Sequence, residues 1–166
     1  MKVEDTNALR FILQDEIYLL DEDKSLYSGT PKSQPEVQTP QPVFNYLGAN
    51  KKNFLILVNY DEHEFIKDEH LVALEAVLGR IGHNRDDVAV LNLAKPESNF
   101  LQILAFFEPK KLMILGESAI PAGMANPKLN STEKREELAV LYTFSFDEMM
   151  TNVENKKVFW EQIKNL

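Results

Sequence analysis

Four short apolar runs are each followed by residues whose side chains or backbone groups could do chemistry. Asn59, Tyr60 and Asp61 come after FLILV, Asn92 and Lys95 lie at and after the end of VAVLN, Gly116, Glu117 and Ser118 follow KLMIL, and Thr143 to Ser145 end the last run. A carboxylate can act as a general base toward water, and amide or hydroxyl groups can hydrogen-bond a polar ligand. The residues that follow these runs are therefore the first candidates for a site.

A metal centre is the next possibility, because histidines and acids mix in the stretch NYDEHEFIKDEH. His63, His70 and Asp61 would be its ligands. A metalloprotease helix needs two histidines four positions apart with a glutamate between them. Here the histidines are seven positions apart. The spacing disfavours a metal, and the acids suit the start of a helix, where carboxylates are stabilised by the helix dipole.

Nucleophile and cofactor signatures are missing from the sequence. Gly116-Glu117-Ser118 begins like a Gly-x-Ser-x-Gly elbow, but the second glycine is absent. The six glycines form neither a dinucleotide-binding loop nor a phosphate-binding loop. Zero cysteines exclude disulfides, thiolate zinc sites and cysteine-held iron-sulfur clusters. We expect no cofactor and no metal.

The apolar runs alternate with helical patterns, and this alternation predicts the fold. Continuous apolar strands between helices favour a parallel sheet that is covered on both faces. The sequence thus predicts an α/β protein, a three-layer α/β/α sandwich with a four-stranded parallel sheet. Ligands in such folds bind beyond the carboxyl ends of the strands, where the residues that follow the apolar runs would lie. The strands are predicted at 53–59, 87–93, 111–116 and 137–144, and the helices at 69–82, 97–107 and 155–166.

The amino-terminal part has a different character. Residues 1–23 contain an amphipathic helix, with an apolar stripe made by Leu9, Ile12, Leu13, Ile17 and Leu20. Residues 24–43 are rich in proline, serine and glutamine and predict an extended linker before the α/β domain at 44–166. The helix either packs on its own domain or docks in a groove of a protein partner.

Composition bears on partners and location. The 166-residue chain has a net charge of −8 and no cluster of basic residues, so direct DNA binding is disfavoured and a protein partner is favoured. No apolar run reaches the roughly 18 residues of a membrane span. The start, MKVEDTNALRF, has acids where a signal peptide carries positive charge. We expect a cytoplasmic protein without a membrane partner.

The closing segment resembles the uracil-DNA glycosylase-like superfamily. Its iron-sulfur members end a last strand in a Thr-x-His-Pro turn, followed by Asn-Pro, a lysine and a helix with a tryptophan. Thr143, Ser145, Asn152, Lys156 and Trp160 occupy the matching places. The strand and turn through Leu115, Gly116 and Ala119, and the segment with Asn92, Lys95 and Pro96, are similar to two further motifs of that family.

The departures from this pattern concern catalysis. Ser145 stands where the family has the histidine that hydrogen-bonds the uracil oxygen, and Phe146 replaces the proline. Residues 59–63 replace the loop that binds phosphate and water, and the cluster cysteines are absent. A hydroxyl stabilises a developing oxyanion less than an aimed imidazole does. The resemblance therefore implies a vestigial pocket at Asn59, Asp61, Asn92, Gly116 and Ser145.

A non-catalytic branch of this scaffold, the family of bacterial DNA polymerase III psi subunits, is similar in overall plan. Its flexible amino-terminal segment docks on the chi partner or the clamp loader. The resemblance implies a non-catalytic accessory subunit of the replicative polymerase, which meets DNA only indirectly. The alternative is a divergent uracil-DNA glycosylase or other nucleobase hydrolase, in which Asp61 positions water and Ser145 or Asn92 holds the base. A protein-interaction domain unconnected with DNA is a third hypothesis.

Overall fold

The computed structural model describes residues 43–94, 99–135 and 137–166. The predicted helix within residues 1–23 and most of the linker at 24–43 lie outside the described residues. The proposed docking stripe at Leu9, Ile12, Leu13, Ile17 and Leu20 is therefore also outside them. Everything below concerns the α/β part of the chain.

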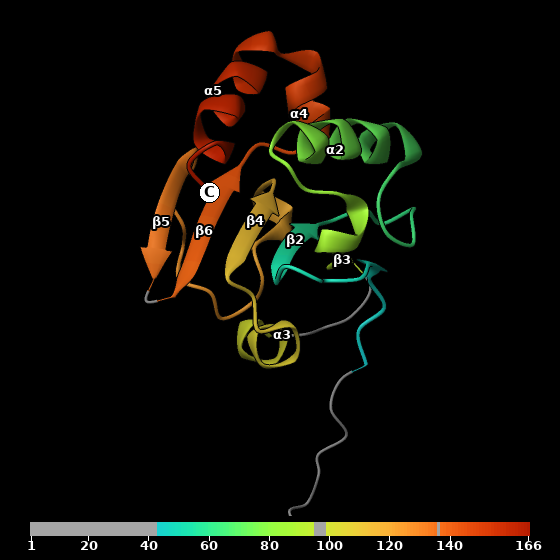
Figure 1. Ribbon diagram of the computed structural model, residues 1–166, viewed down its shortest axis with the longest axis vertical. Helices are drawn as coiled ribbons and strands as arrows, with labels where there is room; N and C mark the ends of the chain where they lie inside the picture. The colour runs from blue at the N-terminus through green and yellow to red at the C-terminus, as the bar shows by residue number, and fades with distance from the viewer. Residues whose placement is uncertain (1–42, 95–98, 136) are drawn as a thin grey trace, which may run out of the picture. The chain divides into compact units, whose positions relative to one another are not determined.

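Six strands and four α-helices make up this part (Figure 1). The strands are β1 (Leu47–Gly48), β2 (Phe54–Val58), β3 (Val88–Asn92), β4 (Lys111–Leu115), β5 (Ser131–Arg135) and β6 (Leu138–Thr143). The helices are α2 (Asp68–Arg80), α3 (Phe100–Phe107), α4 (Phe146–Thr151) and α5 (Val153–Ile163). Two short 3₁₀ turns, η2 (Arg85–Asp87) and η3 (Glu117–Ala119), connect them.

The strands form one mixed sheet in the order β1-β3-β2-β4-β6-β5. The four predicted strands β2, β3, β4 and β6 are all present, and their mutual pairings are parallel. The predicted sheet was nevertheless too small, because β1 and β5 add an antiparallel strand at each edge. The α/β class is confirmed, with a six-stranded mixed sheet in place of the expected four parallel strands.

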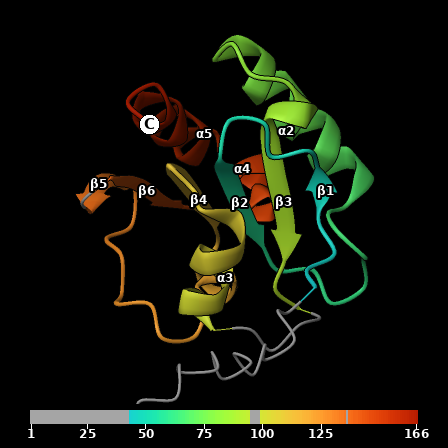
Figure 2. The ribbon, with the colours of Figure 1, turned by 60° about the horizontal axis from the view of Figure 1, so that its bottom comes forward.

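Alternate residues of the central strands supply two hydrophobic cores. Phe54, Ile56 and Val58 of β2 contact the core on the side of α2, α4 and α5. Leu55 and Leu57 face the core that includes Ile103 and Phe107 of α3. Figures 1 and 2 show α2, α4 and α5 on one side of the sheet and α3 on the other. Burial on both faces explains why β2 reads as an uninterrupted apolar run.

The helix starts follow from side chains that cap the backbone. Asn99 at the start of α3 and Ser145 at the start of α4 each form a capping box with the residue three positions later. Asn152 ends α4 and caps α5 by accepting a hydrogen bond from the Glu154 amide. In the described parts of the chain, no helix combines the length and apolar character needed to cross a bilayer.

Candidate functional site

The predicted site residues lie at the end of the sheet where the parallel strands have their carboxyl ends. With reference to the site, 'edge' means this carboxyl end of the sheet. Asn59 follows β2, Asn92 is the last residue of β3, Gly116 follows β4, and Ser145 lies just beyond β6. The strand order reverses between β2 and β4, since the chain runs outward from β2 to β3 and then returns to β4. Open α/β sheets bind ligands at such a reversal. Four of the five candidates thus lie at the carboxyl ends of the parallel strands, and Asp61 lies two residues after Asn59.

The side chain of Asn92 is committed to holding the loop that follows β2. Its Oδ1 accepts hydrogen bonds from the amides of Tyr60 at 2.9 Å and Ala94 at 3.2 Å. Its Nδ2 donates to the carbonyl oxygens of Tyr60 and His63, both at 2.9 Å, and of Glu64 at 3.3 Å. Asn92 is 3% exposed. No donor or acceptor of this amide remains available to hold a base.

Asn59 and Gly116 join the ends of β2, β4 and β6. The Asn59 Nδ2 donates to the carbonyl oxygen of Ser118 at 2.7 Å. Gly116 has a φ of 92°, and a Cβ there would lie 3.0 Å from the Cβ of Ser145. Both the backbone conformation and the close approach therefore require glycine.

Ser145 is the cap of α4. Its hydroxyl donates to the Glu148 carboxylate at 2.8 Å and accepts from the Glu148 amide at 3.3 Å. The Ser145 amide donates to the same carboxylate at 2.8 Å. The preceding Thr143 is fully buried and donates its hydroxyl to the Asn130 Oδ1 at 2.8 Å. The turn that resembles a catalytic corner is built as a helix start.

Asp61 is exposed and belongs to a row of carboxylates. It makes no hydrogen bond or ion pair with another described residue, in contrast to the four other candidates. Many further acids are exposed at the same edge, in the loop after β2, the first turn of α2, η3 and the first turn of α4. They are Glu62, Glu64, Asp68, Glu69, Glu117, Asp147 and Glu148. This edge of the domain is strongly acidic.

Sequence reasoning missed a contact between Tyr60, His70 and Asp147. The Tyr60 hydroxyl is 2.7 Å from the His70 Nδ1, and the His70 Nε2 is 3.6 Å from an Asp147 carboxylate oxygen. Burial raises the pKa of Tyr60 and lowers the pKa of His70. His70 shares the buried stripe of α2 with Leu74 and Leu78. Its position on that stripe was the available signal, because a buried histidine needs polar partners.

The three residues considered as metal ligands, His63, His70 and Asp61, do not form a cluster in the structure. Among residues 43–94, 99–135 and 137–166, no three histidine or acidic side chains converge to hold a metal ion. His70 turns into the protein toward Tyr60, whereas Asp61 is exposed.

A hollow of about 590 Å³ opens at the other end of the sheet, near the amino ends of β2, β4 and β6. Phe100 and Leu104 of α3 give it an apolar side. Charged residues of both signs line it: Lys110, Arg135, Glu108 and Glu137. This mixture selects no sign of ligand charge, and the hollow is remote from the five predicted residues.

No protein-family model and no curated protein sequence matches this chain. Of the five candidates, Gly116 and Ser145 lie close together beyond the ends of β4 and β6. Asn59 donates to the Ser118 carbonyl, Asn92 holds the loop after β2, and Asp61 is exposed.

Proposed function

We propose that this chain is a non-catalytic, protein-binding accessory subunit of the DNA polymerase III clamp-loader assembly, similar to the psi subunit. The scaffold would be the three-layer sandwich of the uracil-DNA glycosylase-like superfamily. The observation that carries the non-catalytic part is the hydrogen bonding of Asn92, whose buried amide is used up by the loop after β2. The assignment to the replication machinery rests on the resemblance of residues 53–166 and on the sequence of the amino-terminal segment.

Ser145 supports the same proposal. A catalytic corner needs a donor that is aimed at the position where negative charge develops. The Ser145 hydroxyl donates instead to the carboxylate of Glu148. A carboxylate at this point would also repel an oxyanion. The corner is therefore poorly suited to breaking a glycosidic bond.

The charge of this edge favours a protein partner over DNA. Nucleic-acid binding requires cations that neutralise phosphates. The carboxylates of Asp61, Glu62, Glu117 and Asp147 are exposed where a glycosylase would meet DNA. They would attract a basic surface of a partner protein and steer its approach.

Affinity purification of the full chain, expressed at its natural level in the source cell, tests the proposal. We expect clamp-loader or chi-like polymerase III subunits to co-purify with the full chain. A chain lacking residues 1–43 should lose them if the amino-terminal helix is the docking segment. A full chain with Asp61→Lys and Glu62→Lys should lose them if the acidic edge is the contact. Recovery of no replication protein with the full chain would refute the assignment.

The exposed carboxylate of Asp61 favours one alternative, a divergent uracil-DNA glycosylase or other nucleobase hydrolase. Asp61 lies beyond the end of β2 and is free to position a water molecule. The test is release of uracil from single-stranded and double-stranded oligonucleotides, with Asp61→Asn as the matched variant. We expect no release from either protein. Release by the natural chain that Asp61→Asn abolishes would overturn the non-catalytic proposal.

A further inference from the structure

His70 lies at the junction of three segments of the acidic edge. The ring is 1% exposed, in the first turn of α2. Its Nδ1 is 2.7 Å from the hydroxyl of Tyr60, which follows β2. On the other side it stacks on Phe146 of α4, with ring centroids 5.4 Å apart and planes at 23°. Asp147 is 3.6 Å from its Nε2. We call these four residues the His70 clasp.

The contacts suit a neutral ring with its proton on Nε2. In this form the Nδ1 accepts the Tyr60 O–H, and the Nε2–H points toward the carboxylate of Asp147. A second proton would turn Nδ1 into a donor. The Tyr60 hydroxyl would then have to accept, and its own hydrogen would lose its acceptor. Proton uptake therefore conflicts with the closed arrangement of the clasp.

The charges around the ring oppose one another. The carboxylates of Asp147 and Glu69 favour a protonated His70, whereas Lys67 and His63 disfavour it. Asp147 is 70% exposed, so water screens its attraction. Burial of the ring is the largest influence and lowers the pKa of His70. The closed clasp thus keeps the ring neutral under conditions where an exposed histidine is protonated.

We propose that the His70 clasp is a pH-sensitive latch, in which protonation of the ring releases α4 from α2. Once open, the ring regains the ordinary histidine pKa of about 6.5. The open form then binds more protons than the closed form, so the latch is fully held above about pH 6.5 and weakens as the pH falls below that value. Because α4 has six residues, it can open without unfolding of the sheet. Opening would expose Phe146 and Met149, which are buried in the closed form.

The test is amide hydrogen exchange of α4 in the full chain, measured by NMR at pH 7.5 and pH 5.5 and corrected for the intrinsic pH dependence of exchange. With an open-state pKa of about 6.5, the population of the open form of α4 should increase by up to about tenfold when the pH falls from 7.5 to 5.5. Amides of the central strands should keep their protection. Equal protection of α4 at the two pH values would refute the latch.

Matched variants identify the titrating group, because the chain has three histidines. His70→Gln should remove the pH dependence. His83→Gln is the control, since His83 is also largely buried with a lowered pKa but lies beyond the other end of α2, beside Lys52. It should leave the pH dependence of α4 unchanged. If α4 exchange in His70→Gln changes with pH as much as in the natural chain, His70 is not the titrating group. If the pH dependence of α4 exchange is lost in His83→Gln, the assignment to His70 is also wrong.

The exposed Asp147 offers a variant that does not disturb the core. Asp147→Asn removes a charge that favours the protonated ring, so the closed form resists proton uptake more strongly. The change in α4 exchange should therefore be as large as in the natural chain, or larger. Loss of the pH dependence in Asp147→Asn would show that the ion pair, and not the buried ring, governs the opening, and would refute the proposal.

Discussion

Replacement of Asn92 by alanine separates a structural role of this residue from a ligand-binding role. The substitution removes five hydrogen bonds to the backbone around the loop after β2, three of them at 2.9 Å. Each such bond contributes about 1 kcal/mol net, and a buried group left without a partner costs about 1–3 kcal/mol. Counting the three short bonds fully, we expect Asn92→Ala to lose about 3–5 kcal/mol of unfolding free energy.

Equilibrium unfolding in urea, followed by the fluorescence of the single tryptophan, measures this loss. With an m-value of about 2 kcal/mol/M, a loss of 4 kcal/mol moves the midpoint down by about 2 M. Asn59→Ala is the matched control, since it removes one partly exposed hydrogen bond to the Ser118 carbonyl. It should cost about 1 kcal/mol.

A small effect would refute the reasoning. If Asn92→Ala costs less than about 1 kcal/mol, or no more than Asn59→Ala, the amide does not hold the loop. Asn92 would then again be a candidate for holding a base, and the alternative function would gain support. The urea midpoints of the two variants decide between these roles.

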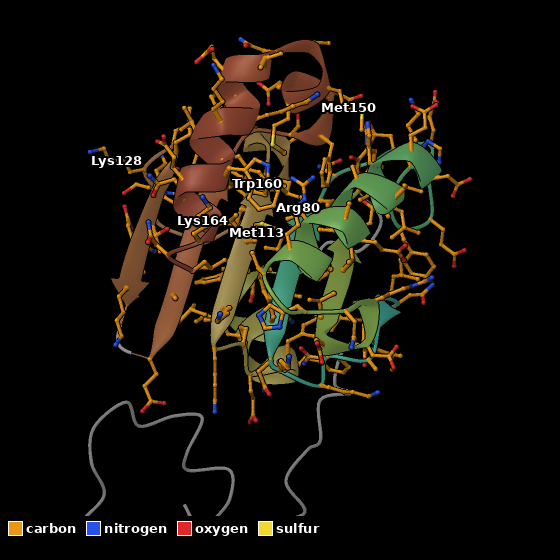
Figure 3. The ribbon with its side chains drawn as sticks, turned by 45° about the horizontal axis from the view of Figure 1, so that its top comes forward. Arg80, Met113, Lys128, Met150, Trp160 and Lys164 are labelled. Atoms are coloured by element: carbon orange, nitrogen blue, oxygen red, sulfur yellow. The ribbon has the colours of Figure 1, made fainter. Side chains whose placement is uncertain are left out.

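Two further substitutions test the close packing of the α/β part. Gly116→Ala should lower the free energy of unfolding by about 1–3 kcal/mol, because the φ of Gly116 is 92° and the new Cβ would crowd Ser145. Gly79→Ala in α2 should raise it by up to about 1 kcal/mol, because the new Cβ meets no atom within 4 Å. Equal effects of the two substitutions in thermal unfolding would contradict this. Trp160 is partly buried and lies 5.1 Å from the Arg80 guanidinium (Figure 3). Trp160→Ala should therefore cost about 2–3 kcal/mol, less than full burial implies, and a loss below 1 kcal/mol would show that the ring is not part of the core.

The central strands were predictable because their physical signal is local. FLILV and VAVLN are buried on both faces, so each is an unbroken apolar run. The edge strands carry no such signal. β1 has two residues, and β5 reads STEKR, which is indistinguishable from a polar loop until β6 pairs with it. The expected sheet was therefore smaller than the observed one.

The positions of the candidate residues were predictable from the sequence, whereas their hydrogen-bond partners were not. Strand order and direction bring Asn59, Asn92 and Ser145 to one edge, and the alternation of strands and helices already indicates this edge. Whether an amide faces a ligand or the backbone depends on the path of a loop, which no spacing rule supplies. The contact between Tyr60 and His70 likewise depends on how α2 docks against the end of β2.

The charges of the edge strand β5 affect whether a strand of another molecule can add to the sheet. Among the described residues β5 pairs with β6 alone. The N–H and C=O groups on its other side could therefore hydrogen-bond a strand of another molecule. Glu133, Lys134 and Arg135 occupy consecutive positions of this short strand. A strand added there would have to strip water from charges of both signs. The charges of β5 therefore oppose amyloid-like extension of the sheet at this strand.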